Sequence, residues 1–173
     1  MEQDHEGRIA KPGAIIRSLE PGDRSRIAEM VISTGKFNDE EVATALELVD
    51  HALKEGEKSG YVFAVLEEGI EGAPVKGYAC YGPTPLTQGV YDLYWIVVDP
   101  AAQGKGFGRL ITRHVEQDVV SRGGRMLLIE TSSQESYGPT VRFYERTGYQ
   151  LAARVKNFYR IGDDKLIFSK DLV

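Results

Sequence analysis

The sequence predicts an α/β fold in which a mostly antiparallel, seven-stranded sheet is flanked by about four helices. Three observations predict it. β-prone runs and helical repeats alternate in the order β-α-α-β-β-β-α-β-α-β-β. Three successive strand-like runs in the middle of the chain indicate antiparallel neighbours. The length of 173 residues suits one hydrophobic core. We therefore expect a single domain over residues 1–173, with about 1–12 as a flexible tail.

The first predicted strand is AIIRSLE, residues 14–20, which alternates weakly and breaks at Pro21-Gly22. Asp23 follows in a position to cap a short helix. The apolar face of this helix contains Ile27, Met30 and Val31.

A longer helix is predicted to begin after Asn38, a favourable N-cap residue, with Glu41 where a capping box requires it. Phe37 and Val42 are placed as a hydrophobic staple across this start. The apolar positions recur at helical spacing in Val42, Ala45, Leu46, Val49 and Leu53. The opposite stripe is acidic and contains Asp39, Glu40, Glu41, Glu47 and Asp50. This stripe is typical of a solvated helix face, and a surface that attracts a cationic amine is the alternative.

Strands are predicted next at residues 61–68 and 74–81, joined by a turn that contains glycine, and then at Val90–Val98. The last run is rich in β-branched and aromatic residues, as a central strand is. A helix is predicted from Phe107 to Val120, ending before Gly123-Gly124.

The run RMLLIET, residues 125–131, is continuously apolar, which favours a strand buried on both faces and parallel to its neighbour across the preceding helix. A helix with Pro139 in its first turn is predicted to reach Thr147, with Gly148 at C′. Residues 149–155 and 165–172 then predict a terminal hairpin around the turn RIGDDK.

Charge and composition exclude several classes of function. The formal net charge of −5 disfavours a protein that works by neutralising nucleic-acid phosphates. No apolar run approaches the roughly 20 residues that cross a bilayer, and the N-terminus is polar, so we expect a cytoplasmic protein. The three histidines are scattered, so no metal site is expected. Cys80 is the only cysteine, which agrees with a reducing compartment.

Glycines at alternate positions, Gly104, Gly106 and Gly108, follow the predicted strand Val90–Val98 and precede a helix, which indicates close approach of backbone to a phosphate. A P-loop requires Ser or Thr after Gly-Lys, but Gly106 follows Lys105. A dinucleotide fingerprint requires glycine where Arg109 stands. Neither of these phosphate-binding motifs fits.

The segment Gln103-Gly104-Lys105-Gly106-Phe107-Gly108 matches the pattern Q/R-x-x-G-x-G/A, and here the chain resembles the GNAT family, the GCN5-related N-acetyltransferases. RFYERTGY, about forty residues on, is similar to the family segment F-Y-x-x-x-G-F/Y, and the order of strands and helices fits the family along the whole chain.

The resemblance implies acetyl-coenzyme A (acetyl-CoA) as donor, without a metal. Its pyrophosphate would be received by successive backbone N–H groups, and the cofactor-binding loop would comprise Gln103, Gly104, Lys105, Gly106, Phe107, Gly108 and Arg109. Lys105 and Arg109 either add charge-assisted contacts or are ordinary surface charges. The pantetheine arm would pair with the main chain of Ile96, Val97 and Val98.

The resemblance also implies catalytic roles. Tyr144, the tyrosine of the F-Y segment, would be the acid that protonates the departing thiolate, with a core aromatic as the alternative. The base is open between Asp92, acting through water, and Glu130, whose burial would raise its pKa. Either carboxylate is alternatively a structural hydrogen-bond acceptor.

One departure from the family pattern precedes the last helix, where relatives often carry Asn and Ala but this chain has Tyr137 and Thr140. Ser132, Ser133 and Tyr137 are candidate hydroxyl donors to the cofactor there. The expected activity is acetyl transfer to a primary amine of a small molecule. Transfer to a protein N-terminus or lysine is the alternative, and a non-catalytic acyl-CoA sensor is the alternative from another class. Dimers are common among relatives, so a homodimer is also considered.

Overall fold

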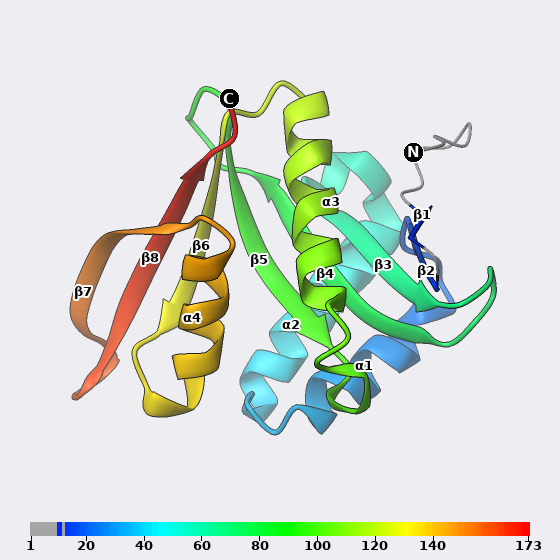
Figure 1. Cartoon of the computed structure of the whole chain (residues 1–173), viewed down its shortest axis with the longest axis horizontal. Helices are drawn as coiled ribbons and strands as arrows, with labels where there is room; N and C mark the ends of the chain where they lie inside the picture. The colour runs from blue at the N-terminus through cyan, green and yellow to red at the C-terminus, as the bar shows by residue number, and fades with distance from the viewer. Residues whose placement is uncertain (1–9, 12) are drawn as a thin grey trace. The chain divides into compact units, whose positions relative to one another are not determined.

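The structure is a computed structural model that describes residues 10–11 and 13–173. The chain forms two compact units. The first runs to Gly82 and resumes over Trp95–Val115, and the second comprises Pro83–Tyr94 and Glu116–Val173 (Figure 1). Strand β5 (Val90–Val98) and helix α3 (Phe107–Ser121) each contribute residues to both units. The expected single domain stays a prediction.

The first unit contains four antiparallel strands in the order β1-β2-β3-β4. Their bounds are β1 Ala10–Lys11, β2 Ala14–Arg17, β3 Val62–Glu68 and β4 Val75–Pro83. The predicted tail of residues 1–12 lies outside the described residues except at Ala10 and Lys11. These two residues pair with Ala14 and Ile15 and so form a short strand that the sequence analysis did not predict.

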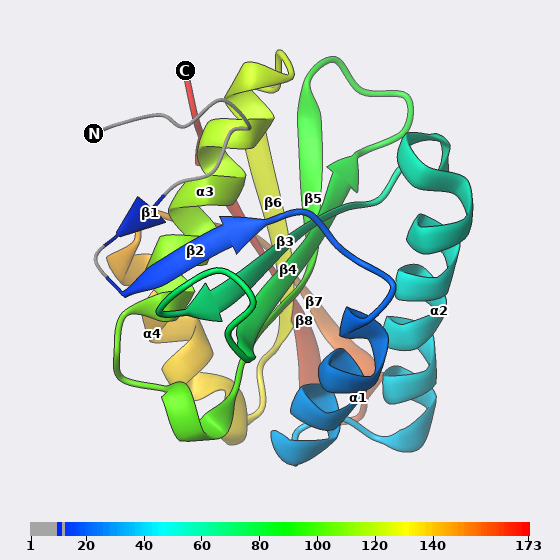
Figure 2. The ribbon, with the colours of Figure 1, turned by 90° about the vertical axis from the view of Figure 1, so that its right-hand side faces the viewer.

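Helices α1 (Asp23–Ser33) and α2 (Asp39–Glu55) lie on the same side of β2, β3 and β4 (Figure 2). The predicted capping box of α2 is confirmed, since Asn38 Oδ1 accepts from Glu41 N at 2.8 Å and Glu41 Oε2 accepts from Asn38 N at 2.8 Å. The two helices close an apolar core over the strands; its buried members are Ile27, Met30, Val31, Val49, Phe63, Val65, Val75, Tyr78, Cys80 and Val97. After α2 comes a short 3-10 turn, η1 (Gly56–Ser59).

The predicted cap of α1 is wrong. Gly22 is the N-cap and Asp23 is the first helical residue, and no side chain caps the helix. The Asp23 carboxylate is buried instead and accepts two hydrogen bonds from Arg17, at 2.8 and 2.9 Å. Arg17 also donates to the buried Glu67 at 2.7 Å, so the carboxylate is used to neutralise a buried cation.

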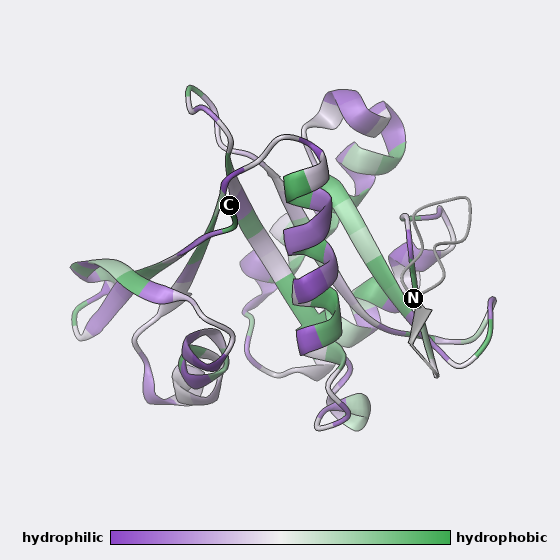
Figure 3. Ribbon diagram, turned by 45° about the horizontal axis from the view of Figure 1, so that its top comes forward, coloured by the Kyte–Doolittle hydropathy of each residue, from purple (hydrophilic) through white to green (hydrophobic). Residues whose placement is uncertain are grey.

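The first half of α3 packs tightly on β4 in the first unit. A Cβ added to Gly77 of β4 would come within 2.9 Å of Ile111 Cδ1 and 3.0 Å of the Val97 carbonyl oxygen. Hydrophobic and hydrophilic segments alternate along α3, as expected of a helix that is buried on one side (Figure 3). Glycine at position 77 therefore lets the end of β5 and helix α3 approach β4 closely.

The second unit contains four strands in the order β5-β6-β8-β7. β5 pairs with β6 (Met126–Ser132) in parallel, which confirms the predicted crossover through a helix. β6 pairs antiparallel with β8 (Asp163–Asp171), and β8 with β7 (Gln150–Arg160), which confirms the terminal hairpin. Helix α4 (Gly138–Arg146) follows the turn η3 (Glu135–Tyr137), and the predicted C′ residue Gly148 has a φ of 93°.

The predicted order of strands and helices is confirmed, with β1 added in front. The prediction that the strand at 125–131 is buried on both faces is wrong, because burial alternates along β6 and Glu130 is exposed. Within the described residues, none of the helices combines the length and the apolar character that crossing a membrane requires.

Candidate active site

The glycine-rich segment lies between β5 and α3 in the first unit. It begins with η2 (Pro100–Ala102), a 3-10 turn whose N-cap is Asp99 and which starts with proline. Gly104 and Gly106 have φ values of 81° and 83°, a region that L side chains rarely adopt. A Cβ at either position would meet no atom within 4 Å, so glycine serves the backbone conformation here and not internal packing.

Unused backbone donors collect at the end of this loop. The first hydrogen bond of α3 runs from Leu110 N to the Gly106 carbonyl oxygen at 3.1 Å. The N–H groups of Phe107, Gly108 and Arg109 therefore have no acceptor within the helix. Residues 103–106 are exposed, and the helix dipole places a partial positive charge at the start of α3. The arrangement suits an anionic group held by backbone.

The loop also carries charged side chains, and only one of them has a close partner in the structure. Lys105 Nζ lies 2.6 Å from Glu68 Oε1 of β3, with half of the lysine side chain exposed. Arg109 is exposed, whereas Phe107 is buried and anchors the start of α3. Lys105 can therefore contact a phosphate only if its ion pair with Glu68 breaks, or if Lys105 Nζ contacts Glu68 and the phosphate at the same time.

The end of β5 that precedes the loop also lies in the first unit. Val97 is buried, while Ile96 and Val98 are partly exposed. The ladder between β5 and β6 runs from Val90 opposite Met126 to Leu93 opposite Ile129, and β5 continues to Val98.

Tyr144 lies on α4 in the second unit and is 4% exposed. Its ring contacts those of Tyr149 and Phe168, with centroids 5.9 and 6.0 Å away. Burial raises the pKa of the Tyr144 phenol above its ordinary value, because this apolar environment disfavours the phenolate. Tyr144 therefore retains its proton where a free tyrosine would begin to lose it.

The two candidate bases lie on neighbouring strands of the second unit. Asp92 of β5 is opposite Leu128 of β6, so Asp92 and Glu130 project from the same face of this strand pair. Asp92 is partly buried and its Oδ2 accepts a hydrogen bond of 2.6 Å from the Thr84 hydroxyl.

The expected burial of Glu130 is not observed. Its side chain is 49% exposed, and its Oε2 lies 2.7 Å from Lys165 Nζ, which itself lies 3.9 Å from the centre of the Phe158 ring. The apolar run misled the prediction because Glu130 projects from the less buried face of β6.

Ser132 and Ser133, two of the candidate hydroxyl donors before α4, are hydrogen-bonded within the protein. Ser132 donates to Asp163 at 2.5 Å and accepts from Gln134 N at 3.0 Å, and Ser133 Oγ accepts from Asp164 N at 2.8 Å. These bonds tie the loop to the start of β8. On the acidic stripe of α2, for which an amine-attracting surface was the alternative interpretation, Asp50 is paired with Arg24 at 2.5 Å.

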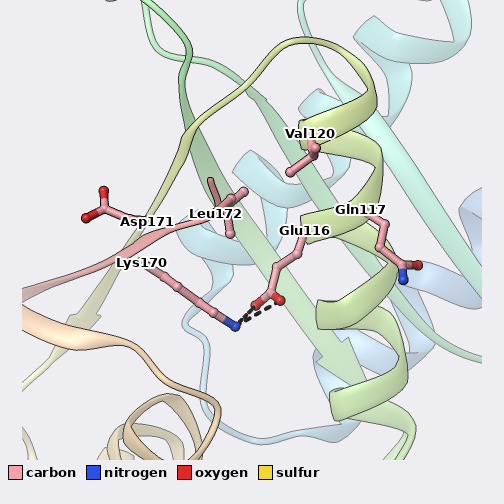
Figure 4. Close-up of a pocket in the computed structure, with 6 residues that line it drawn as sticks. All are labelled: Glu116, Gln117, Val120, Lys170, Asp171 and Leu172. Atoms are coloured by element: carbon pink, nitrogen blue, oxygen red, sulfur yellow. Dashed lines mark hydrogen bonds and ion pairs between the residues drawn. The ribbon is translucent and has the colours of Figure 1, made fainter.

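A pocket of about 330 Å³ lies in the second unit between the last turns of α3 and the C-terminal strand (Figure 4). Two of its charged groups pair with each other: Lys170 Nζ contacts both Glu116 oxygens at 2.9 Å and donates to the Thr147 carbonyl oxygen at 2.9 Å. Tyr149 also donates to Glu116 at 2.9 Å. This network braces the Tyr149 ring that contacts Tyr144.

The structure places the predicted cofactor residues, Ile96–Val98 and Gln103–Arg109, in the first unit, and Asp92, Glu130 and Tyr144 in the second. Sequence reasoning missed Thr84, Lys165 and Glu68, the partners of three predicted site residues. Each partner lies on another strand or loop, so spacing alone carries no signal for it.

In the part of the chain that the structure describes, no group of three or more His, Cys, Asp or Glu side chains is arranged to hold a metal ion.

Comparison with known proteins places these features in a family. Residues 58–151 match the family model of the acetyltransferase (GNAT) domain. None of the curated proteins matches the chain. Among solved structures, a GNAT-family protein from Desulfovibrio desulfuricans is 45% identical, and the alignment covers 92% of this chain and 99% of that chain with a TM-score of 0.88.

Two more distant structures share the fold. YncA from Salmonella typhimurium, solved with its cofactor acetyl-CoA, is 21% identical over 93% of this chain and 95% of that chain, with a TM-score of 0.71. An aminoglycoside 6'-N-acetyltransferase in complex with coenzyme A is 15% identical over 91% of this chain and 97% of that chain, also with a TM-score of 0.71.

Proposed function

Because the chain belongs to the GNAT family of acetyltransferases, we propose that it transfers the acetyl group of acetyl-CoA to a primary amine of a small molecule, directly within a ternary complex. The observation that carries the proposal is the loop Gln103–Arg109. Its two glycines with positive φ and the three N–H groups after them that have no acceptor within the helix suit a pyrophosphate.

In the proposed complex the loop holds the donor. The N–H groups from Gly104 to Arg109 receive the pyrophosphate, and Lys105 and Arg109 add charge. The main chain of Ile96, Val97 and Val98 pairs with the pantetheine arm. The end of the β5–β6 ladder at Leu93 and Ile129 supports this role, because the β5 residues beyond it include these three. That YncA and the aminoglycoside acetyltransferase were solved with acetyl-CoA and coenzyme A is consistent with the same donor here.

The reaction forms a C–N bond and breaks a C–S bond. The neutral amine attacks the carbonyl carbon of the thioester, and the resulting tetrahedral intermediate collapses with departure of the thiolate. The sulfur takes a proton from the Tyr144 hydroxyl, the proton lost by the amine passes to a base and then to solvent, and the Tyr144 phenolate regains a proton from solvent. Burial raises the pKa of the Tyr144 phenol, so the group is protonated before each turnover; its assignment as the acid comes from its place in the F-Y segment.

The partners of the two carboxylates support Asp92 as the base. Asp92 is partly buried, and its Oδ2 accepts from a neutral group, the Thr84 hydroxyl. Glu130 is exposed, and its Oε2 is already engaged by Lys165 Nζ at 2.7 Å. Asp92 acts through a bridging water, and Thr84 orients its carboxylate.

The test is thiol release from acetyl-CoA with the purified chain across a library of amines, which also contains peptides with free N-termini and lysines. Amine-dependent release that falls sharply in Tyr144→Phe supports the proposal. Release with peptides alone would move the acceptor to proteins. Acetyl-CoA binding without release from any amine would contradict catalysis and leave a sensor of acyl-CoA.

A further inference from the structure

The backbone that enters the cofactor-binding loop is tied to the first unit through Asp99. Asp99 N donates to the Lys76 carbonyl oxygen of β4 at 2.8 Å, which fixes the position of the residue against the sheet. Its own carbonyl oxygen accepts from Ala102 N at 2.8 Å, and its Oδ1 accepts from Ala101 N at 3.0 Å. Asp99 thus sets both the place where the loop leaves the sheet and the direction of its first turn.

The other carboxylate oxygen of Asp99 faces helix α1. Arg26 donates to it from Nη2, while Arg26 Nε donates to the Val75 carbonyl oxygen at 3.1 Å. The Asp99 side chain is 12% exposed and that of Arg26 is 30% exposed. Lys76 Nζ lies 3.7 Å from the same oxygen. Two cations therefore hold one nearly buried carboxylate, although neither cation belongs to the loop.

Electrostatics favour the charged form of this carboxylate. Burial opposes ionisation of Asp99, but the N–H of Ala101 and the guanidinium of Arg26 outweigh it and hold the pKa below its usual value. The ion pair is therefore present throughout the neutral range, and it is less screened by salt than a fully exposed pair.

We propose that Arg26 and Asp99 are positioning residues for the donor: their ion pair holds the glycine-rich loop in the conformation that receives the pyrophosphate. The inference rests on the proposed function, because it assumes that the loop binds acetyl-CoA. Neither residue touches the cofactor. They act by limiting the conformations of a loop whose two glycines would otherwise allow many.

A loop that is ordered before the ligand arrives loses less conformational entropy on binding. Without the ion pair, only a fraction of the molecules holds the N–H groups of the loop in the orientation that receives the pyrophosphate. The apparent affinity is the intrinsic affinity multiplied by this fraction. The effect appears in the affinity for acetyl-CoA. Turnover at saturating acetyl-CoA changes little, because the bound loop is ordered by the ligand itself.

The experiment is a double-mutant cycle with Arg26→Gln, Asp99→Asn and the double variant. Asp99→Asn keeps a side-chain oxygen that accepts from Ala101 N but removes the negative charge. The variant therefore distinguishes the effect of losing the ion pair from the effect of losing the hydrogen bond in the turn. Each single variant is expected to weaken coenzyme A binding, measured by calorimetry, about tenfold. The double variant is expected to lose less affinity than the product of the two single losses, since both single variants remove the Arg26–Asp99 ion pair. The kcat at saturating acetyl-CoA is expected to stay within about twofold.

The matched control is Arg24→Gln, on the same helix, which removes the exposed ion pair with Asp50 and is expected to leave coenzyme A affinity unchanged. Hydrogen exchange of the ligand-free protein adds a readout independent of activity: amides 101–109 exchange faster in Arg26→Gln and not in Arg24→Gln. Wild-type affinity in Arg26→Gln and Asp99→Asn, multiplicative losses in the double variant, or equal exchange would overturn the positioning role. A wild-type protein that binds no coenzyme A would overturn the proposed function as well.

Discussion

Replacing Gly106 with alanine tests whether the loop needs a residue with positive φ at this position. Gly106 has a φ of 83°, and a Cβ there would meet no protein atom within 4 Å, so the change adds no internal clash. An L residue in this region costs about 1–2 kcal/mol. Because the loop is exposed, the free protein relaxes to avoid this cost, and the ligand must restore the strained conformation. The penalty then appears in binding, as a loss of about 5- to 30-fold in affinity for acetyl-CoA.

The assay is the KM for acetyl-CoA together with calorimetric binding of coenzyme A. Gly60→Ala is the matched control: Gly60 has a φ of 76°, an added Cβ there also meets nothing, and it follows η1 after helix α2. This control carries the same backbone penalty and is expected to lose stability but no affinity. A KM for acetyl-CoA within twofold of the wild-type value in Gly106→Ala would refute the assignment of the loop to the pyrophosphate.

Three further predictions concern the catalytic acid, the loop charge and stability. Tyr144→Phe is expected to lower kcat about 100-fold at unchanged KM for acetyl-CoA, and an equal loss of cofactor affinity would count against its role as the acid. Glu68→Gln frees Lys105 from its 2.6 Å ion pair, so the KM for acetyl-CoA is expected to fall about two- to fivefold at low salt; an unchanged or higher KM would contradict a phosphate contact from Lys105. Burial raises the pKa of Tyr78, Cys80 and Tyr144. Above about pH 8, the folded state therefore keeps protons that the unfolded chain releases. The free energy of unfolding is expected to keep the whole contribution of these groups below about pH 8 and to fall as the pH rises above it. Chemical denaturation at several pH values measures this, and constant stability up to about pH 11 would contradict it.

Most of the fold followed from local signals in the sequence. The capping box of Asn38 and Glu41 and the terminal hairpin are formed by neighbouring residues, so spacing and turn chemistry sufficed to predict them. The glycines at 104 and 106 were likewise recognisable, because positive φ is a property of single residues.

The features that failed or were missed depend on contacts between distant segments. Glu130 reads as buried within an apolar run, yet it lies on the less buried face of β6 beside Lys165. Arg26 and Asp99 are 73 residues apart, and nothing in the spacing of either residue indicates the other. Asp23 reads as an N-cap, but Arg17 draws its carboxylate into a buried ion pair. In each case the outcome depends on an ion pair between segments that are distant in the sequence.

The fate of the acetyl group tests the central claim most directly. The purified chain is incubated with acetyl-CoA labelled in its acetyl group and with an amine that supports thiol release, and the products are separated and weighed by mass spectrometry. Direct transfer predicts label on the amine nitrogen, free coenzyme A in equal amount and no label on the protein. Label that remains on coenzyme A, or that accumulates on the protein in the absence of amine, would contradict the account.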